Sequence, residues 1–203
     1  MVIGVGAVAV DLFLLRGHPT WERLAVGAAA TALLLAVAGF DRSSLGLVAR
    51  PQQPLRWWVR ATLLAGAAVG LFCVAAAGVL QLFDVVVFPD RPLFRDADHL
   101  WWFLRYGTLV APPLEELFYR LCLCAPLAAA LGRWPTIVLS GVVFALFHFA
   151  YGNPAPDNFI AGYVLAWAYL HSGTLLVPIA LHALGNLAVW AVLALHHAWY
   201  YQG

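Results

Sequence analysis

Three ionisable side chains, Glu115, Glu116 and Arg120, stand inside the apolar run VAPPLEELFYRLCL at residues 110–123. In a helix, Glu116 and Arg120 are four residues apart, so they share one face and can form an ion pair. Glu115 lies about 100° further round the helix and has no basic partner at helical spacing. Such a carboxylate is suited to accept a proton from a water molecule. The alternative is that all three side chains form a buried structural ion-pair network.

Two further stretches add imidazole and amide groups. His148 ends the stretch FALFH, one helical turn after Phe144, and His182 and Asn186 are four residues apart in HALGN. An imidazole can orient a water or donate to a developing oxyanion, and an asparagine amide can also donate. Either histidine alone would be typical of a hydrogen-bonded contact between helices. Together with the acidic motif, they form a set that could activate water and stabilise an oxyanion.

The composition indicates that lipid surrounds these groups. The chain has 203 residues, of which 64% are hydrophobic and 10% charged, and its mean hydropathy is +0.84. Soluble domains average about 25% charged residues, and one membrane-spanning helix needs about 20 apolar residues. We therefore predict an all-α, polytopic transmembrane helical bundle of about seven or eight membrane helices in the cell membrane. The net charge of +1 gives no indication of a nucleic-acid partner.

Apolar runs predict where the helices lie. They cover residues 2–15, 24–40, 61–83, 100–131, 135–150, 158–171 and 175–197. The fourth run is long for one helix and contains Pro112 and Pro113, so we expect either one kinked helix or a short helix followed by another. We interpret residues 1–203 as a single integral membrane domain. Its catalytic core would be about 100–190, with accessory helices within 1–83.

Other reactive side chains in the apolar runs have simpler interpretations. Cys73, Cys122 and Cys124 are interpreted as small apolar fillers, because a C-x-C pair on one helix is not a zinc pattern. Asp11 is a lone acid in the first run. It would either face a cavity or belong to an N-terminal segment that does not fully insert.

Counting along the runs gives the two histidines different depths in the membrane. His148 falls near the outer end of its run, and His182 falls about two helical turns from the inner end of its own, with Glu115 between them. The three can meet only if the helices tilt, if run 158–171 is short or re-entrant, or if the motif helix begins at Pro113. Water must also reach them, because peptide hydrolysis consumes it.

The three motifs together resemble those of a known family. E-E-x-x-x-R at 115–120, F-x-x-x-H at 144–148 and H-x-x-x-N at 182–186 are similar to the motifs of the CAAX protease and bacteriocin-processing (CPBP, or Abi) family. This family includes relatives of the type II CAAX prenyl protease. The order and spacing of the motifs fit as well, and the resemblance implies an intramembrane endopeptidase.

The resemblance also implies roles for the residues of the first two motifs. Glu115 matches the glutamate that activates the attacking water. Glu116 matches its neighbour, which we expect to pair with Arg120 and hold the site together. His148 matches the histidine that helps to orient the water, and Phe144 is expected to shape the pocket.

The third motif completes the implied site. His182 and Asn186 match the pair that stabilises the oxyanion of the tetrahedral intermediate. The glutamate mechanism implied by the resemblance needs no cofactor. Zinc stays open as an alternative, with Glu115, His148 and His182 as ligands, because two histidines and a glutamate are a known catalytic zinc set.

We therefore expect a glutamic-type endopeptidase that hydrolyses a peptide bond in a membrane-anchored protein or peptide, with membrane lipid as its other partner. Two alternatives come from other classes. One is a non-catalytic membrane scaffold or immunity protein, which would use the buried polar set for structure. The other is a proton-coupled transporter with Glu115 and the histidines as a proton relay. The absence of an internal repeat speaks against the transporter.

Overall fold

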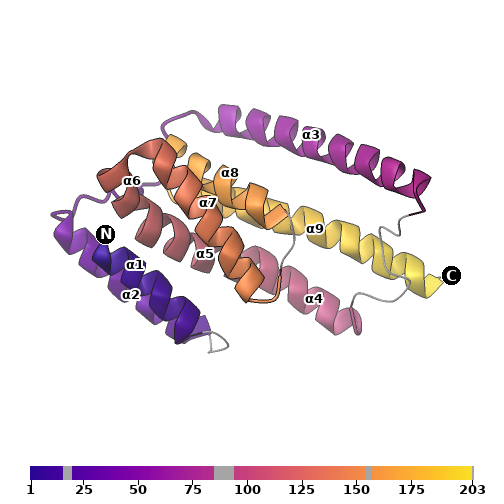
Figure 1. The fold of residues 1–203 in the computed structure, drawn as a ribbon, viewed down its shortest axis with the longest axis horizontal. Coiled ribbons are helices and arrows are strands. Elements are labelled where there is room, and N and C mark those ends of the chain that lie inside the picture. The colour runs from indigo at the N-terminus through magenta and orange to yellow at the C-terminus, as the bar shows by residue number, and fades with distance from the viewer. Residues whose placement is uncertain (16–19, 85–93, 154–156, 203) are drawn as a thin grey trace. The chain divides into compact units, whose positions relative to one another are not determined.

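The computed structural model describes residues 1–15, 20–84, 94–153 and 157–202, apart from the side chains of Cys73, Asp157 and Gln202. Every regular element in these residues is helical, which confirms the predicted all-α fold (Figure 1). The α-helices are α1 (Val2–Phe13), α2 (Thr20–Val37), α3 (Leu55–Leu82), α4 (Ala97–Arg105), α5 (Ala111–Glu116), α6 (Ala125–Leu131), α7 (Arg133–Ala150), α8 (Asp157–Ser172) and α9 (Leu176–Gln202). Two π-helical segments are η1 (Tyr106–Val110) and η2 (Leu117–Cys124).

The described helices form two compact units. The first consists of Met1–Gln52 and Leu109–Ala183, and the second of Gln53–Thr108 and Leu184–Gly203. The first unit therefore contains α1, α2, α5 to α8 and the first turns of α9. The second contains α3, α4 and the rest of α9. That the chain is one integral membrane domain stays a prediction.

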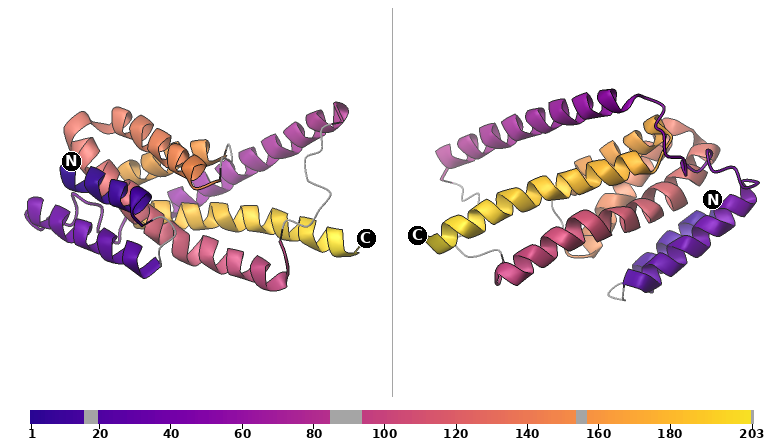
Figure 2. Two further views of the ribbon diagram at one scale, coloured as in Figure 1. Left: turned by 60° about the horizontal axis from the view of Figure 1, so that its bottom comes forward. Right: turned by 180° about the vertical axis from the view of Figure 1, so that it is seen from behind.

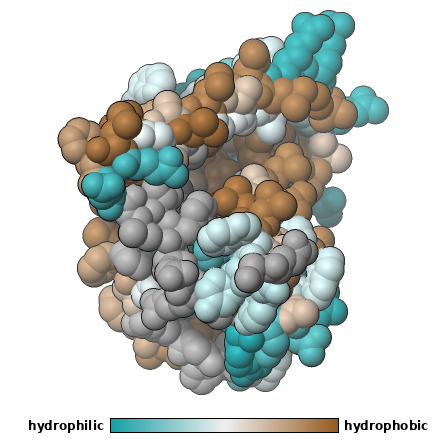
Figure 3. All heavy atoms as spheres, turned by 90° about the vertical axis from the view of Figure 1, so that its right-hand side faces the viewer, coloured by the Kyte–Doolittle hydropathy of each residue, from teal (hydrophilic) through white to brown (hydrophobic). Residues whose placement is uncertain are grey.

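Four of the described helices, α2, α3, α7 and α9, are long and apolar enough to cross a membrane. Helix α1 is apolar but has only 12 residues, and α8 has 16. The predicted number of about seven or eight spans stays a prediction. Large apolar side chains reach the surface on many helices, and Figure 3 shows several of them, in brown, among hydrophilic residues on the face in view. Lipid is the surrounding in which such side chains are stable.

The predicted long helix at 100–131 is helical throughout, and its irregularities coincide with prolines. Each π-helical segment is followed by an α-helical segment with proline near its start: Pro112 and Pro113 in α5, and Pro126 in α6. Proline has no N–H and its ring crowds the preceding turn, so the regular hydrogen-bond ladder cannot continue through it. The wider π turns are the local adjustment. Of the two expected possibilities, the single irregular helix is the one observed.

The core of the first unit is built around η2. Phe118, Leu121 and Cys122 are fully buried there, and Phe144 of α7 is fully buried in the same cluster. Helices α7 and α8 lie side by side (Figure 1), as do α1 and α2 (Figure 2). Cys122 and Cys124 are buried and free, which fits their interpretation as apolar fillers. The side chain of Cys73 lies outside the described residues.

Asp11 has a partner that the sequence analysis did not assign. Arg23 of α2 donates from Nε and Nη2 to the two carboxylate oxygens of Asp11, at 2.6 and 2.8 Å. This two-bond pairing holds α1 against α2. Tyr151, which follows α7, donates its hydroxyl to the main-chain carbonyl of Asp11 at 3.3 Å. The end of α7, three residues beyond His148, is thereby tied to α1.

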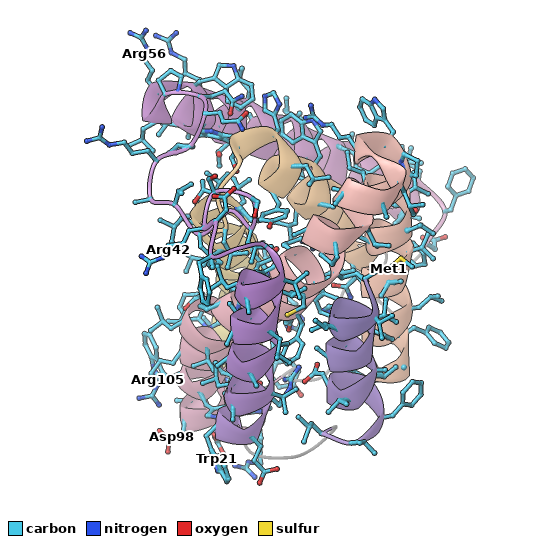
Figure 4. The ribbon with its side chains drawn as sticks, turned by 90° about the vertical axis from the view of Figure 1, so that its left-hand side faces the viewer. Met1, Trp21, Arg42, Arg56, Asp98 and Arg105 are labelled. Carbon is cyan, nitrogen blue, oxygen red and sulfur yellow. The ribbon has the colours of Figure 1, made fainter. Side chains whose placement is uncertain are left out.

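The loop that follows α2 holds the turn from which α9 starts. The amide of Leu175 donates to the carbonyl of Gly46 at 2.8 Å, and the amide of Gln52 donates to the carbonyl of Ser172 at 2.8 Å. The start of α9, which carries His182, is therefore fixed by main-chain hydrogen bonds within the first unit. Figure 4 shows Trp21 and Arg42 at opposite ends of α2. Tryptophan and arginine at the ends of an apolar helix are typical membrane-interface anchors.

Gly4→Ala should destabilise the first unit, because α1 approaches η2 at backbone distance. A Cβ at Gly4 would lie 1.8 Å from the carbonyl oxygen of Cys122, whereas a Cβ at Gly6 would meet nothing within 4 Å. Overpacking of this kind lowers the free energy of unfolding by about 1–3 kcal/mol. Gly6→Ala is the matched control and should be neutral or stabilising, since alanine favours helix over glycine. Equal unfolding free energies for the two variants would contradict the close packing.

Candidate active site

The acidic motif lies where α5 meets η2, and its predicted ion pair is present. Arg120 donates from Nε to Oε2 of Glu116 at 2.7 Å, and both side chains are fully buried. Four-residue spacing places them together on one helix face, as the sequence predicted. A buried ion pair needs further hydrogen bonds to offset the loss of hydration, and both residues have them.

Arg120 extends the network to α7. Its Nη1 donates to the hydroxyl of Ser140 at 2.8 Å, and its guanidinium lies 5.0 Å from the centre of the Phe144 ring. Ser140 is fully buried and was missed by the sequence analysis. The spacing could have indicated Ser140 as a site residue. It lies four residues before Phe144 and eight before His148, so the three side chains share one face of α7.

Glu116 extends the network to α9. Its second oxygen, Oε1, lies 2.9 Å from Nδ1 of His182. An ionised carboxylate only accepts hydrogen bonds, so Nδ1 of His182 carries the hydrogen and donates it. The hydrogen bonds from Arg120 to Glu116 and from His182 to Glu116 thus fix the orientation of the His182 ring. They leave Nε2 of His182 facing away from Glu116.

His148 is oriented in the same way by a different acceptor. Its Nδ1 lies 2.9 Å from the carbonyl oxygen of Phe144. A carbonyl also only accepts, so Nδ1 of His148 is the donor. In a neutral ring Nε2 then has a free lone pair. The one-turn spacing of the F-x-x-x-H motif is therefore what allows the backbone to set the tautomer of His148.

The Nε2 atoms of the two histidines both face Glu115. Oε2 of Glu115 lies 3.6 Å from Nε2 of His148 and 3.9 Å from Nε2 of His182. Both distances are longer than direct hydrogen bonds. Oε2 of Glu115 is buried and has no hydrogen-bond partner in the protein. The predicted convergence of one acid and two imidazoles is therefore observed within the first unit.

The protonation state of the two rings decides what these three atoms can bind. With both rings neutral, a carboxylate oxygen and two nitrogen lone pairs face one another, so a donor of hydrogen bonds such as water suits the space between them. The side chains of Glu115, His148 and His182 are 19%, 16% and 8% exposed, so the group is shielded but not sealed. Such shielding strengthens electrostatic interactions.

The zinc alternative can be compared with this geometry. Among the described residues, no group of three or more histidine, cysteine, aspartate or glutamate side chains is arranged to hold a metal ion. Glu115, His148 and His182 are not arranged as such a group in this part of the chain. That the protein needs no cofactor stays a prediction, with zinc as the open alternative.

Asn186, the remaining predicted site residue, belongs to the second unit. It lies four residues beyond His182 along α9, as the H-x-x-x-N motif requires. Its Nδ2 donates to the carbonyl oxygen of Gly107, in η1, at 2.7 Å. Because Nδ2 carries two hydrogens, this bond leaves one of them for another acceptor. The anchoring of Asn186 by Gly107 was not visible from the motif.

Comparison with known proteins extends this picture. No curated protein and no solved structure gives a significant match to the chain. The family model described as "Type II CAAX prenyl endopeptidase Rce1-like" matches residues 97–188, a segment that contains all six predicted site residues. Residues 97–188 of this chain are therefore similar to the Type II CAAX prenyl endopeptidase Rce1-like family, which confirms the resemblance drawn from the three motifs.

Proposed function

We propose that this protein is an intramembrane endopeptidase in which Glu115 activates the water that attacks the peptide bond. The similarity of residues 97–188 to the Rce1-like family supports a membrane protease. The observation that carries the glutamate mechanism is the buried Oε2 of Glu115, which has no hydrogen-bond partner in the protein and faces Nε2 of both His148 and His182. Neighbouring Glu116 is engaged by Arg120 and His182, so only Glu115 has an oxygen free for chemistry.

In the first step, Glu115 takes a proton from the water while the water oxygen forms a bond to the scissile carbonyl carbon. Nε2 of His148 accepts a hydrogen bond from the second hydrogen of the water, which stays on the oxygen, because Nδ1 of His148 is committed to the carbonyl of Phe144. The water is thereby oriented by two acceptors. Glu115 later passes its proton to the leaving amine, and the carbon–nitrogen bond breaks.

The oxyanion would be stabilised by His182 together with Asn186. Since Nδ1 of His182 already donates to Glu116, this ring can donate to an oxyanion only when Nε2 is also protonated. Glu116 would stabilise the resulting positive charge, as a carboxylate behind a histidine does in other hydrolases. Arg120 in turn keeps Glu116 ionised and in place. Asn186 would contribute the hydrogen of Nδ2 that is not bonded to Gly107.

The surroundings of the group support a class of substrate. Glu116 and Arg120 are fully buried and the helices around them are apolar, which supports a peptide that reaches the group from the membrane. We therefore propose a membrane-anchored protein or peptide as substrate, processed in the cell membrane by a multi-pass enzyme.

Cleavage by the purified protein in proteoliposomes tests this function. With a library of membrane-anchored peptides as substrate, His148→Ala and His182→Ala should each reduce the cleavage rate by about 10²-fold or more. His171→Ala is the matched control, because His171 pairs with Arg133 of α7 rather than with Glu115 or Glu116. The same reaction with a chelator tests the zinc alternative, since the glutamate mechanism predicts an unchanged rate. Full activity in both histidine variants would overturn the proposal.

A further inference from the structure

The anchor of Asn186 is a backbone carbonyl in an irregular stretch of helix. Gly107, whose oxygen accepts the hydrogen bond from Asn186 Nδ2 at 2.7 Å, lies in the π-helical segment η1. Carbonyls inside a helix normally accept from the backbone further along the chain. A carbonyl that binds a side chain instead therefore needs an explanation in the local sequence.

Pro112 supplies that explanation. In a π-helical turn, a carbonyl accepts from the residue five positions ahead. For Tyr106 that residue is Ala111, which has an N–H. For Gly107 it is Pro112, which has none. The Gly107 carbonyl is therefore left without its backbone donor, and the amide of Asn186 takes that place.

We propose that Pro112 is a positioning residue for catalysis, because the N–H that it lacks keeps the Gly107 carbonyl available to orient Asn186. This inference rests on the proposed role of Asn186 as an oxyanion donor. One Nδ2 hydrogen is held by Gly107, so the direction of the other is fixed before substrate binds. Pre-orientation matters because a donor stabilises an oxyanion without reorganisation only when its direction is already set.

A second contact keeps α9 in register independently of this bond. Trp190, one turn beyond Asn186, donates from Nε1 to the carbonyl of Leu100 in α4 at 3.0 Å, and its ring packs against Trp101. Loss of the Asn186–Gly107 bond alone should therefore change the direction of one amide and leave the packing of α9 on α4 intact.

Pro112→Ala restores an N–H that can donate to the Gly107 carbonyl and displace Asn186. We expect kcat for peptide cleavage to fall by about 10-fold, a fraction of the 10²–10³-fold that loss of an oxyanion donor causes, with KM unchanged. Pro113→Ala is the matched control. Its restored N–H would face the carbonyls of Thr108 or Leu109, so kcat should stay at the wild-type value.

Pro112→Ala both adds an N–H and removes the proline ring, and a backbone ester at position 112 distinguishes the effects of these two changes on activity. Replacement of Pro112 by lactic acid gives the same methyl side chain as alanine but no N–H, so it should recover most of the activity lost in Pro112→Ala. In an Asn186→Ala background, Pro112→Ala should cause no further loss, because both changes remove one interaction. Equal activity of the ester and Pro112→Ala, or additive losses, would overturn the proposal.

Hydrogen exchange of the Asn186 amide tests the hydrogen bond to Gly107 without a measurement of catalysis. In the wild-type protein, one Nδ2 hydrogen of Asn186 should exchange with solvent more slowly than the other in an NMR experiment, and Pro113→Ala should keep this difference. Equal exchange of the two hydrogens would overturn the proposal even if Pro112→Ala does not fold. If Glu115→Gln cleaves like the wild type, the proposed function is wrong. The exchange experiment still tests whether Gly107 holds the Asn186 amide, because it does not depend on cleavage.

Discussion

Glu115→Gln should reduce the rate of peptide cleavage in proteoliposomes by about 10²–10⁴-fold, which is the usual contribution of a general base. Glutamine has the shape of glutamate but cannot accept the proton of the attacking water. Oε2 of Glu115 has no hydrogen-bond partner in the protein, so the substitution breaks no hydrogen bond of that oxygen. The free energy of unfolding should therefore stay close to that of the wild type while catalysis is lost.

The neighbouring glutamate provides the matched comparison. Glu116→Gln makes the same chemical change one residue later, but it removes the charge that pairs with Arg120 and holds His182. It should lower the unfolding free energy as well as the cleavage rate. Asp98→Asn, at an exposed position in α4, controls for a general effect of removing one acid. Wild-type cleavage by Glu115→Gln would eliminate the glutamate mechanism.

Arg120→Met should lower the free energy of unfolding by about 3–5 kcal/mol, the range measured when one partner of a buried ion pair is removed. The carboxylate of Glu116 would remain fully buried beside His182 with its strongest partner gone. Methionine fills part of the volume, so most of the effect would come from the unpaired charge. Chemical denaturation of the purified protein, followed by tryptophan fluorescence, measures the loss.

The double variant Glu116→Gln/Arg120→Met distinguishes charge from packing. When both charges are replaced by neutral groups of similar size, a buried ion pair is often lost at little net cost. The double variant should therefore be more stable than Arg120→Met alone, although it should lose activity because His182 loses its orienting carboxylate. Strictly additive losses of stability would contradict the ion pair as the source of the effect.

The N-terminal helices illustrate why some contacts could not be predicted. The bond between Asp11 and Arg23 joins residues twelve apart on different helices, across a helix pair whose register no short motif specifies. Tyr151 and Asp11 are 140 residues apart. The sequence showed an unpaired acid in an apolar run, but the identity of its partner depends on how α1 and α2 pack.

The sequence alone determined what depends on local spacing and composition. Apolar runs predicted an all-α protein with membrane-spanning helices, and four-residue spacing predicted the pairing of Glu116 with Arg120, because one helical turn brings such residues together whatever surrounds the helix. The three motifs also indicated the family whose model matches residues 97–188. Tertiary structure decided which atoms meet: that Nδ1 of His182 binds Glu116, and that both Nε2 atoms face Glu115. These outcomes depend on the packing of separate helices, which side-chain shape and burial fix only when the whole unit folds.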